Sequence, residues 1–148
     1  MATTYSFLDV QASLVGPGGS ISLGSGAGAA EEGITIEPVS EMNKMTIGAD
    51  GTPMHSLSAD KSGRVIVRLL KTSPTNQKLT TLHNFQRTSS ANHGQNTVTI
   101  SNNISGDVYT CQAVAFAKVP NNTYAKDANM IEWNFDAGII DPSLGSGV

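Results

Sequence analysis

The chain has 148 residues, a formal net charge of −3 and only 14% charged residues. This length fits one domain with a sizeable core, and the negative charge excludes a general nucleic-acid-binding protein, which is normally basic. The 15 glycines, together with many Ser, Thr and Asn residues, favour short strands joined by turns over long helices.

The first third of the chain is predicted to form short strands. Apolar residues alternate with polar ones over residues 5–15, which predicts a half-buried strand with four side chains facing the core: Leu8, Val10, Ala12 and Leu14. The Gly-Pro-Gly-Gly sequence at residues 16–19 is a strong turn signal. Residues 20–23 and 34–36 are then predicted as two further short strands.

Residues 39–62 contribute little to a core and are predicted as a long, exposed hairpin or loop. Met45 and Ile47 alternate before Asp50-Gly51, a dipeptide typical of hairpin turns. Met42 and Met54 flank this turn, and such adaptable apolar side chains suit a surface that docks onto another chain. The alternative is a mobile loop with scattered apolar residues.

The middle of the chain contains the clearest strand, Gly63 to Leu70. Val65, Val67 and Leu69 are predicted on one face of this strand, with Arg64, Ile66 and Arg68 on the other. Ser73-Pro74 is a helix start signal, and a helix is predicted over residues 74–88 with a buried stripe of Leu79, Leu82 and Phe85. Residues 97–101 are predicted as another strand.

Two long strands are predicted near the C-terminus. Residues 107–119 place one set of side chains on a common face: Tyr109, Cys111, Ala113, Ala115 and Ala117. Val108, Val114 and Phe116 lie on the other face, so the second half of this strand is predicted to be covered on both sides. Residues 130–140 alternate, with an apolar face of Ile131, Trp133, Phe135, Ala137 and Ile139. Residues 142–148 are predicted as a loose tail. These elements predict a single domain over residues 1–148, mainly β, a β-sandwich or β-barrel with one flanking α-helix.

Charge is divided into blocks along the chain. Residues 1–60 contain seven acidic residues and one basic residue, residues 61–106 contain six basic residues and no acid, and residues 107–148 contain five acids and two lysines. Three interpretations fit this asymmetry: a polyanion site, complementary patches on a self-assembling subunit, or a dipolar monomer with solvated charges.

No catalytic, metal-binding or cofactor motif is apparent, so we expect neither an enzyme nor a cofactor. His55, His83 and His93 lack acids or cysteines at ligand spacing. Glu132 and Asp136 lie about 13 Å apart along an extended strand, beyond the usual separation of paired glycosidase carboxylates. The single cysteine, Cys111, excludes an intrachain disulfide, and its apolar surroundings predict a buried, inert thiol.

No signal-peptide pattern and no apolar run of about 20 residues is visible in the sequence. We therefore expect a protein without a membrane segment that is made in a cytoplasm and either stays soluble there or assembles there.

Four segments resemble tail tube proteins of contractile-tailed bacteriophages: YSFLDVQASLVGPGGSISLG, AAEEGITIE, MTIGADGTPMHSLSADKSGRVIVRLLKTSPTNQKL and TYAKDANMIEWNFDAGIID. The resemblance runs from about Tyr5 to Asp141. It implies hexameric rings stacked into a hollow virion tube, assembled in the host bacterial cytoplasm, with DNA passing through the lumen. It also implies three kinds of protein partner: a contractile sheath, a tape measure protein and a baseplate.

This resemblance suggests roles for two groups of residues. Contacts between rings or subunits are expected at the hairpin and the charge blocks: Glu31, Glu32, Glu41, Met45, Asp50, Met54, Arg64, Arg68 and Lys71. In particular, Arg64, Arg68 and Lys71 are hypothesised to pair with Glu31, Glu32 or Glu41 of a neighbouring subunit. Glu132, Asn134 and Asp136 are hypothesised to face the lumen as an acidic wall; the alternative is an ordinary solvated strand face.

Three other functions are compatible with the sequence. A virion decoration or carbohydrate-binding β-sandwich is one, although aromatic residues make up only 5% of the chain and sugar platforms usually need exposed aromatic rings. The tube subunit of a type VI secretion system is a second, because that family is similar in mechanism. A small hydrolase is a third, and no nucleophile or acid–base pair supports it.

Overall fold

The computed structural model describes residues 4–24 and 29–146, and over them the chain is mostly β-strand with one α-helix. The predicted fold class is therefore confirmed. The elements, in chain order, are η1 (Phe7–Asp9), β1 (Val10–Gly16), β2 (Gly19–Ser22), β3 (Ala29–Pro38), β4 (Asn43–Ile47), β5 (Pro53–Leu57), β6 (Gly63–Leu70), α1 (Thr75–Gln86), β7 (Asn96–Asn102), β8 (Asp107–Phe116) and β9 (Met130–Ser143).

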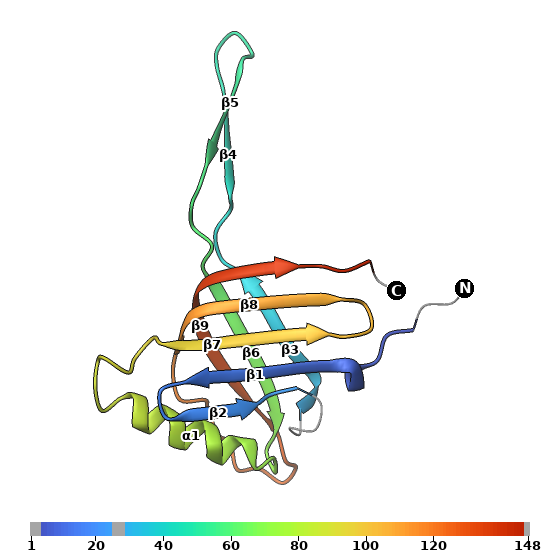
Figure 1. The fold of residues 1–148 in the computed structure, drawn as a ribbon, viewed down its shortest axis with the longest axis vertical. Coiled ribbons are helices and arrows are strands. Elements are labelled where there is room, and N and C mark those ends of the chain that lie inside the picture. Colours follow the sequence, from blue (N-terminus) through green and yellow to red (C-terminus); the bar gives the residue numbers. More distant parts are fainter. Residues whose placement is uncertain (1–3, 25–28, 147–148) are drawn as a thin grey trace.

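Seven strands form one antiparallel sheet in the order β2-β1-β7-β8-β9-β6-β3, and β4 and β5 form a separate two-stranded sheet. The large sheet folds into two layers, with β1, β2, β7 and β8 crossing β3 and β6 at a steep angle (Figure 1). β9 bends and joins the layers, because its first half pairs with β6 and its second half with β8. α1 lies against the end of the body beside β2.

The core fills the space between the two layers. Val65, Val67 and Leu69 of β6 are fully buried and lie opposite the inward side chains of β9, as the alternating pattern predicts. Phe135 is also fully buried, and its ring lies 4.9 Å from that of Phe116 on β8. Each large apolar side chain buried in this way contributes roughly 1.5–3 kcal/mol, so this cluster holds the layers together.

A β-bulge in β8 changes which side chains of the two C-terminal strands face the core. Ala113 has a φ of +53°, and two residues of β8, Gln112 and Ala113, lie opposite one residue of β7, Thr97, so Cys111 and Val114 both face the core. The adjacent β9 changes phase after Gly138: Ile140 is 4% exposed, whereas Ile139, predicted in the core, is 39% exposed. The predicted apolar face of residues 130–140 was therefore wrong at Ile139. In β8, Val114 and Phe116 are buried together with Cys111, whereas Ala113, predicted on the same face as Cys111, is exposed.

Both ends of the described chain differ from expectation. Leu8, predicted in the core, is 78% exposed, because residues 7–9 form a 3₁₀ turn instead of a strand. Ser6 caps this turn, since its Oγ accepts a hydrogen bond from the Leu8 N–H. The loose tail was predicted to start at residue 142, but Pro142 and Ser143 still pair with β8. The Gly145 N–H then donates to Asp107 Oδ1 at 2.8 Å.

α1 is shorter than predicted by about one residue at its start and two at its end. Pro74 rather than Ser73 occupies the N-cap, and Ser73 Oγ accepts a hydrogen bond from the Thr75 N–H. Phe85, predicted in the buried stripe, is 46% exposed. Its place is taken by Gln86, whose amide is buried in a reciprocal pair of hydrogen bonds with Asn96, at 2.6 and 2.8 Å.

Two titratable side chains, Cys111 as predicted and His83, are buried in the core. Cys111 is fully buried, and burial raises the pKa of its thiol to about 11, so the thiolate needed for reactivity does not form near neutral pH. His83 on α1 is 7% exposed, with its ring 4.9 Å from Phe116. Burial lowers the pKa of His83, which keeps this imidazole neutral within the packed layer.

Candidate assembly surfaces

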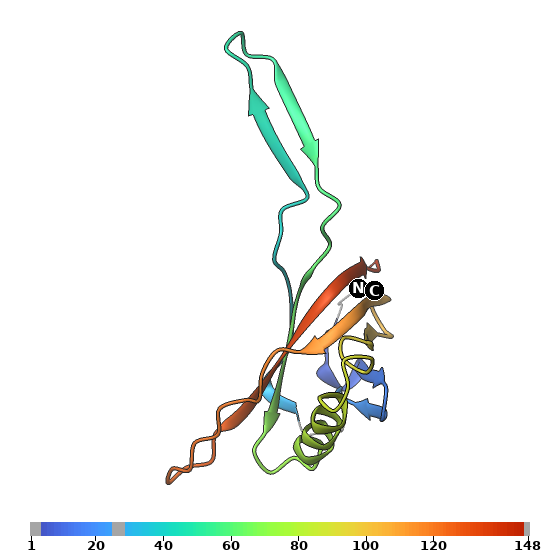
Figure 2. The same cartoon turned by 90° about the vertical axis from the view of Figure 1, so that its left-hand side faces the viewer.

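The most prominent surface is the β4–β5 hairpin, which stands away from the body of the protein (Figures 1 and 2). Every residue of both strands is exposed. The hairpin closes with an Asp50-Gly51 turn in which the Thr52 N–H donates to Asp50 Oδ1 at 3.0 Å and Gly51 has a φ of +87°. This hydrogen bond lowers the pKa of Asp50, which thus stays ionised at the tip.

Cross-strand register gives the hairpin two unlike faces. Paired residues share a face, so Met45 with His55, Ile47 with Pro53, and Asn43 with Leu57 lie on one side. We call this side the apolar face; Met45 is 57% exposed, Ile47 54% and Leu57 88%. The opposite side carries Lys44, Thr46, Met54 and Ser56. The two predicted contact residues Met45 and Met54 are thus both exposed but point in opposite directions.

A carboxylate joins the two arms of the hairpin at its base. Ser40 Oγ donates to Asp60 Oδ2 at 2.5 Å, and the Ser62 N–H donates to Asp60 Oδ1 at 2.9 Å. These hydrogen bonds lower the pKa of Asp60 to about 2 from an ordinary value of 3.8, and the bond from Ser40 has the largest effect. The base of the hairpin is therefore held in place by an ionised side chain.

The Asp60 clamp predicts a pH dependence. A carboxyl whose pKa is lowered on folding stabilises the folded form above its unfolded pKa of 3.8, and the contribution disappears as pH falls through about 2. An NMR titration of the Asp60 carboxyl is expected to show a midpoint near 2. In the Ser40→Ala variant the midpoint is expected to rise toward 3.8. A wild-type midpoint near 3.8 would contradict the clamp.

The outer surface of β3, β6 and the part of β9 paired with β6 carries polar and charged side chains, and we call it the charged face. Its register places Arg64 beside Asp136 and Arg68 beside Glu132, with nitrogen–oxygen distances of 3.9 and 3.3 Å. Asn134 lies between these pairs, opposite Ile66. The predicted lumen residues Glu132, Asn134 and Asp136 therefore do share one face. That face carries both signs of charge, however, and is not purely acidic.

The three cations predicted to contact a neighbouring subunit already have partners in their own chain. Besides the two arginine pairs, Arg68 Nη1 donates to Thr35 Oγ1 at 2.8 Å. Lys71 Nζ donates to the Thr123 carbonyl at 2.5 Å and lies 4.0 Å from the centre of the Tyr124 ring. Pairing of Arg64, Arg68 and Lys71 across subunits remains a prediction, and it requires these contacts to be shared or exchanged.

The acidic residues assigned to that pairing are placed differently from one another. Glu41 is exposed between β3 and β4, near the base of the hairpin. Glu31 and Glu32 belong to β3, but their side chains lie outside the described part of the structure. Of these acids only Glu41 has a described side chain, and within the described residues no ion pair joins it to Arg64 or Arg68.

Two strand edges are open. Over the described residues, β2 pairs only with β1 and β3 only with β6, so each leaves one row of backbone donors and acceptors without a strand partner. Open edges of this kind are normally covered, because they pair readily with other chains. The longer of the two, β3, is the edge strand of the charged face.

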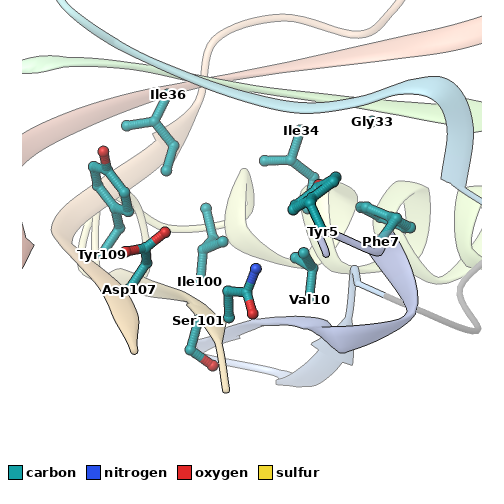
Figure 3. A pocket seen from close by; sticks show the side chains of 11 residues that line it. Tyr5, Phe7, Val10, Gly33, Ile34, Ile36, Ile100, Ser101, Asp107 and Tyr109 are labelled. Atoms are coloured by element: carbon teal, nitrogen blue, oxygen red, sulfur yellow. The ribbon is translucent and has the colours of Figure 1, made fainter. Parts of the chain in front are cut away.

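The described residues offer little for catalysis. A cleft of about 310 Å³ opens between the two layers, lined by residues before β1 and by parts of β1, β3, β7 and β8 (Figure 3). Its lining is largely apolar, and it contains Asp107 but no histidine, lysine or cysteine. Among the side chains that the structure describes, no three metal-ligating groups converge, and no described helix is long and apolar enough to cross a membrane.

Comparison of the sequence with known proteins identifies the family of the chain. Residues 1–145 match the family model described as bacteriophage PhiTE tail tube protein. A relative, "Structural protein ORF10" of Pseudomonas phage KPP10, is 27% identical over 100 residues, which cover 68% of this chain. The match spans 58% of the length of that relative.

Solved structures of contractile injection systems share the fold. A chain in the cryo-EM structure of the PVC sheath/tube terminator in the extended state is 12% identical with a TM-score of 0.64, covering 97% of this chain and 99% of that one. A chain in the six-fold symmetrised baseplate of the anti-feeding prophage is 9% identical with a TM-score of 0.58, covering 100% of both chains. The predicted resemblance is thus confirmed. The chain belongs to the bacteriophage PhiTE tail tube protein family and is a structural component of a phage tail, not an enzyme.

Proposed function

We propose that this protein is the repeating subunit of the tail tube, forming hexameric rings that stack into a hollow channel for DNA. The observation that carries the proposal is the β4–β5 hairpin. A two-stranded hairpin on its own is at best marginally stable in water, and this one exposes Met45, Ile47 and Leu57 along one face. An apolar face on a projecting arm is typical of a protein interface. A neighbouring subunit is therefore the expected cover.

The ring is supported by the open strand edges. Lateral pairing that covers β3 with a strand of the next subunit would extend the charged face around the ring and remove the exposed edge. Unlike surfaces meet in such a contact, so copies related by rotation close into a ring. The six-fold symmetrised assembly of the structurally similar anti-feeding prophage baseplate supports six as the number of subunits.

The charged face is the proposed lumen wall. It is mostly polar: of the large exposed apolar side chains of β6 and β9, Leu70 and Met130 lie at strand ends, and Ile139 lies beyond the part of β9 that pairs with β6. Its arginines are paired with carboxylates of the same subunit, at Asp136 and Glu132. Paired arginines offer little attraction to phosphate, so DNA passes without binding tightly.

The resemblance also supplies the proposed partners and location. We infer that a contractile sheath surrounds the tube, that a tape measure protein occupies it before infection, and that the baseplate starts its assembly in the host cytoplasm. The sheath/tube and baseplate assemblies that contain the structural neighbours support these partners.

A tube terminator is the second candidate, because a chain from the PVC sheath/tube terminator has the same fold over 97% of this chain. A terminator would form single closed rings and stop growth. A tube subunit would form filaments of variable length. The form of the assembly therefore distinguishes the two functions.

Electron microscopy and analytical ultracentrifugation of the purified full-length protein test the proposal. With rising concentration, and with purified phage baseplates as seeds, we expect hollow tubes with six subunits per ring and Glu132, Asn134 and Asp136 lining the channel. A protein that stays monomeric even with baseplate seeds would refute the tube function. Isolated rings alone would support a terminator, and a map placing those three residues outside would refute the lumen assignment.

A further inference from the structure

A shallow groove lies between α1 and β2, with a volume of about 450 Å³. Leu82 and Ile21 are buried beneath it, and Phe85 forms a wall that is 46% exposed. Gly18 has a φ of +102°, and a Cβ on it would lie 2.7 Å from Phe85 Cδ1. The aromatic ring is thus packed closely on a glycine, which gives the groove a fixed apolar wall.

The groove and the hairpin lie at opposite ends of the molecule. Both views place α1 and β2 at the end of the body away from β4 and β5 (Figures 1 and 2). The open edge of β2 runs beside the groove. Copies stacked head to tail therefore bring the hairpin of one copy to the groove-bearing end of the next.

The two surfaces are complementary in character. The apolar face of the hairpin presents Met45, Ile47 and Leu57, and the groove offers Phe85 as an exposed apolar partner. The lining of the groove includes Lys78 and no acidic side chain, whereas the tip of the hairpin carries the ionised Asp50. Both apolar matching and opposite charge favour this pairing over contact between like ends.

We propose that the groove between α1 and β2 receives the β4–β5 hairpin of a second copy in the adjacent ring. The assignment rests on the proposed stacking into a tube and adds to it the receiving surface. One unlike pair of surfaces, hairpin and groove, makes the contact open-ended: each added ring presents a free hairpin at one end and a free groove at the other.

Site-specific photocrosslinking in the assembled full-length protein tests the pairing. Phe85 is replaced by benzoylphenylalanine, a larger photoreactive derivative of phenylalanine, and the protein is assembled from equal amounts of ¹⁵N-labelled and unlabelled chains. After irradiation, mass spectrometry is expected to find links from position 85 to residues 43–57, including pairs of mixed isotope composition. The same photoreactive residue at Tyr5, which is 71% exposed elsewhere, is the control and is expected not to reach the hairpin.

A second variant measures the contribution of the groove. Phe85→Ala is expected to raise the concentration needed for assembly at least tenfold while the monomer keeps its near-ultraviolet circular dichroism. Tubes whose position 85 links to other segments, or to the sheath protein, would overturn the groove assignment and leave the tube function intact. If the wild-type protein failed to assemble both at high concentration and with baseplate seeds, the groove assignment and the tube function would both be overturned.

Discussion

Replacing the apolar face of the hairpin with serine is expected to abolish tube assembly at ordinary concentrations without unfolding the subunit. The variant carries Met45→Ser, Ile47→Ser and Leu57→Ser, three exposed positions on one side of the β4–β5 ribbon. Burial of each side chain in an interface is worth about 1.5 kcal/mol or more. Because roughly 1.4 kcal/mol corresponds to a tenfold change, the assembly concentration should rise on the order of a thousandfold.

A matched variant on the opposite face provides the control. Lys44→Ser, Thr46→Ser and Met54→Ser alter the same number of side chains in the same two strands. Sedimentation is expected to show a much smaller change in assembly for this control. Both variants should retain the Trp133 fluorescence of the wild type, because the indole lies in the core and its Nε1 donates to Asn76 at 3.0 Å. Normal assembly of the apolar-face variant would refute the role of this surface.

Two adjacent isoleucines in β9 are expected to differ sharply in their effect on stability. Ile140→Ala should lower the free energy of unfolding by about 2–5 kcal/mol, because it removes a buried side chain and leaves a cavity. Ile140 is 4% exposed and Ile139 is 39% exposed. Ile139→Ala is therefore expected to cost less than about 1 kcal/mol, as is usual for positions near the surface.

Thermal and urea unfolding of the monomer measure this difference. For a domain of this size, the Ile140 variant should lose roughly 5–15 °C in Tm, and the Ile139 variant only a few degrees. The pair makes a strict comparison, since the same substitution is made at consecutive positions of one strand. Equal losses, or a larger loss at Ile139, would show that strand alternation continues unbroken through Gly138.

The pattern of the sequence predicts the regular parts of the fold well. Alternation places Val65 and Val67 in β6 and Trp133 and Phe135 in β9 on the buried side, and all four are there. Local alternation is sufficient in these strands because each keeps one face toward the core along the length concerned. The Asp50-Gly51 signal likewise identifies the hairpin from a local preference for positive φ.

The missed features depend on contacts between distant segments. The bulge at Ala113 arises where β8 meets β7 and β9, and Gly138 accommodates it, since a Cβ there would lie 3.0 Å from Ala113 Cβ. In the sequence, the adjacent isoleucines Ile139 and Ile140 are the feature that could have indicated this change of phase, because strict alternation cannot bury two neighbouring side chains. The pairing of Arg64 with Asp136 needed the β6–β9 register, which joins residues far apart in the sequence.

The hairpin is attached to the body at two directly paired residues, Pro38 of β3 and Gly63 of β6. Its arms can therefore lengthen during evolution without disturbing the register of the large sheet. One added cross-strand pair extends the reach by about 3.3 Å but turns the new tip residues to the opposite face. A tip that keeps its orientation thus requires insertions of four residues in total, or about 6.6 Å of reach. Natural variation in arm length is consequently expected to be stepwise.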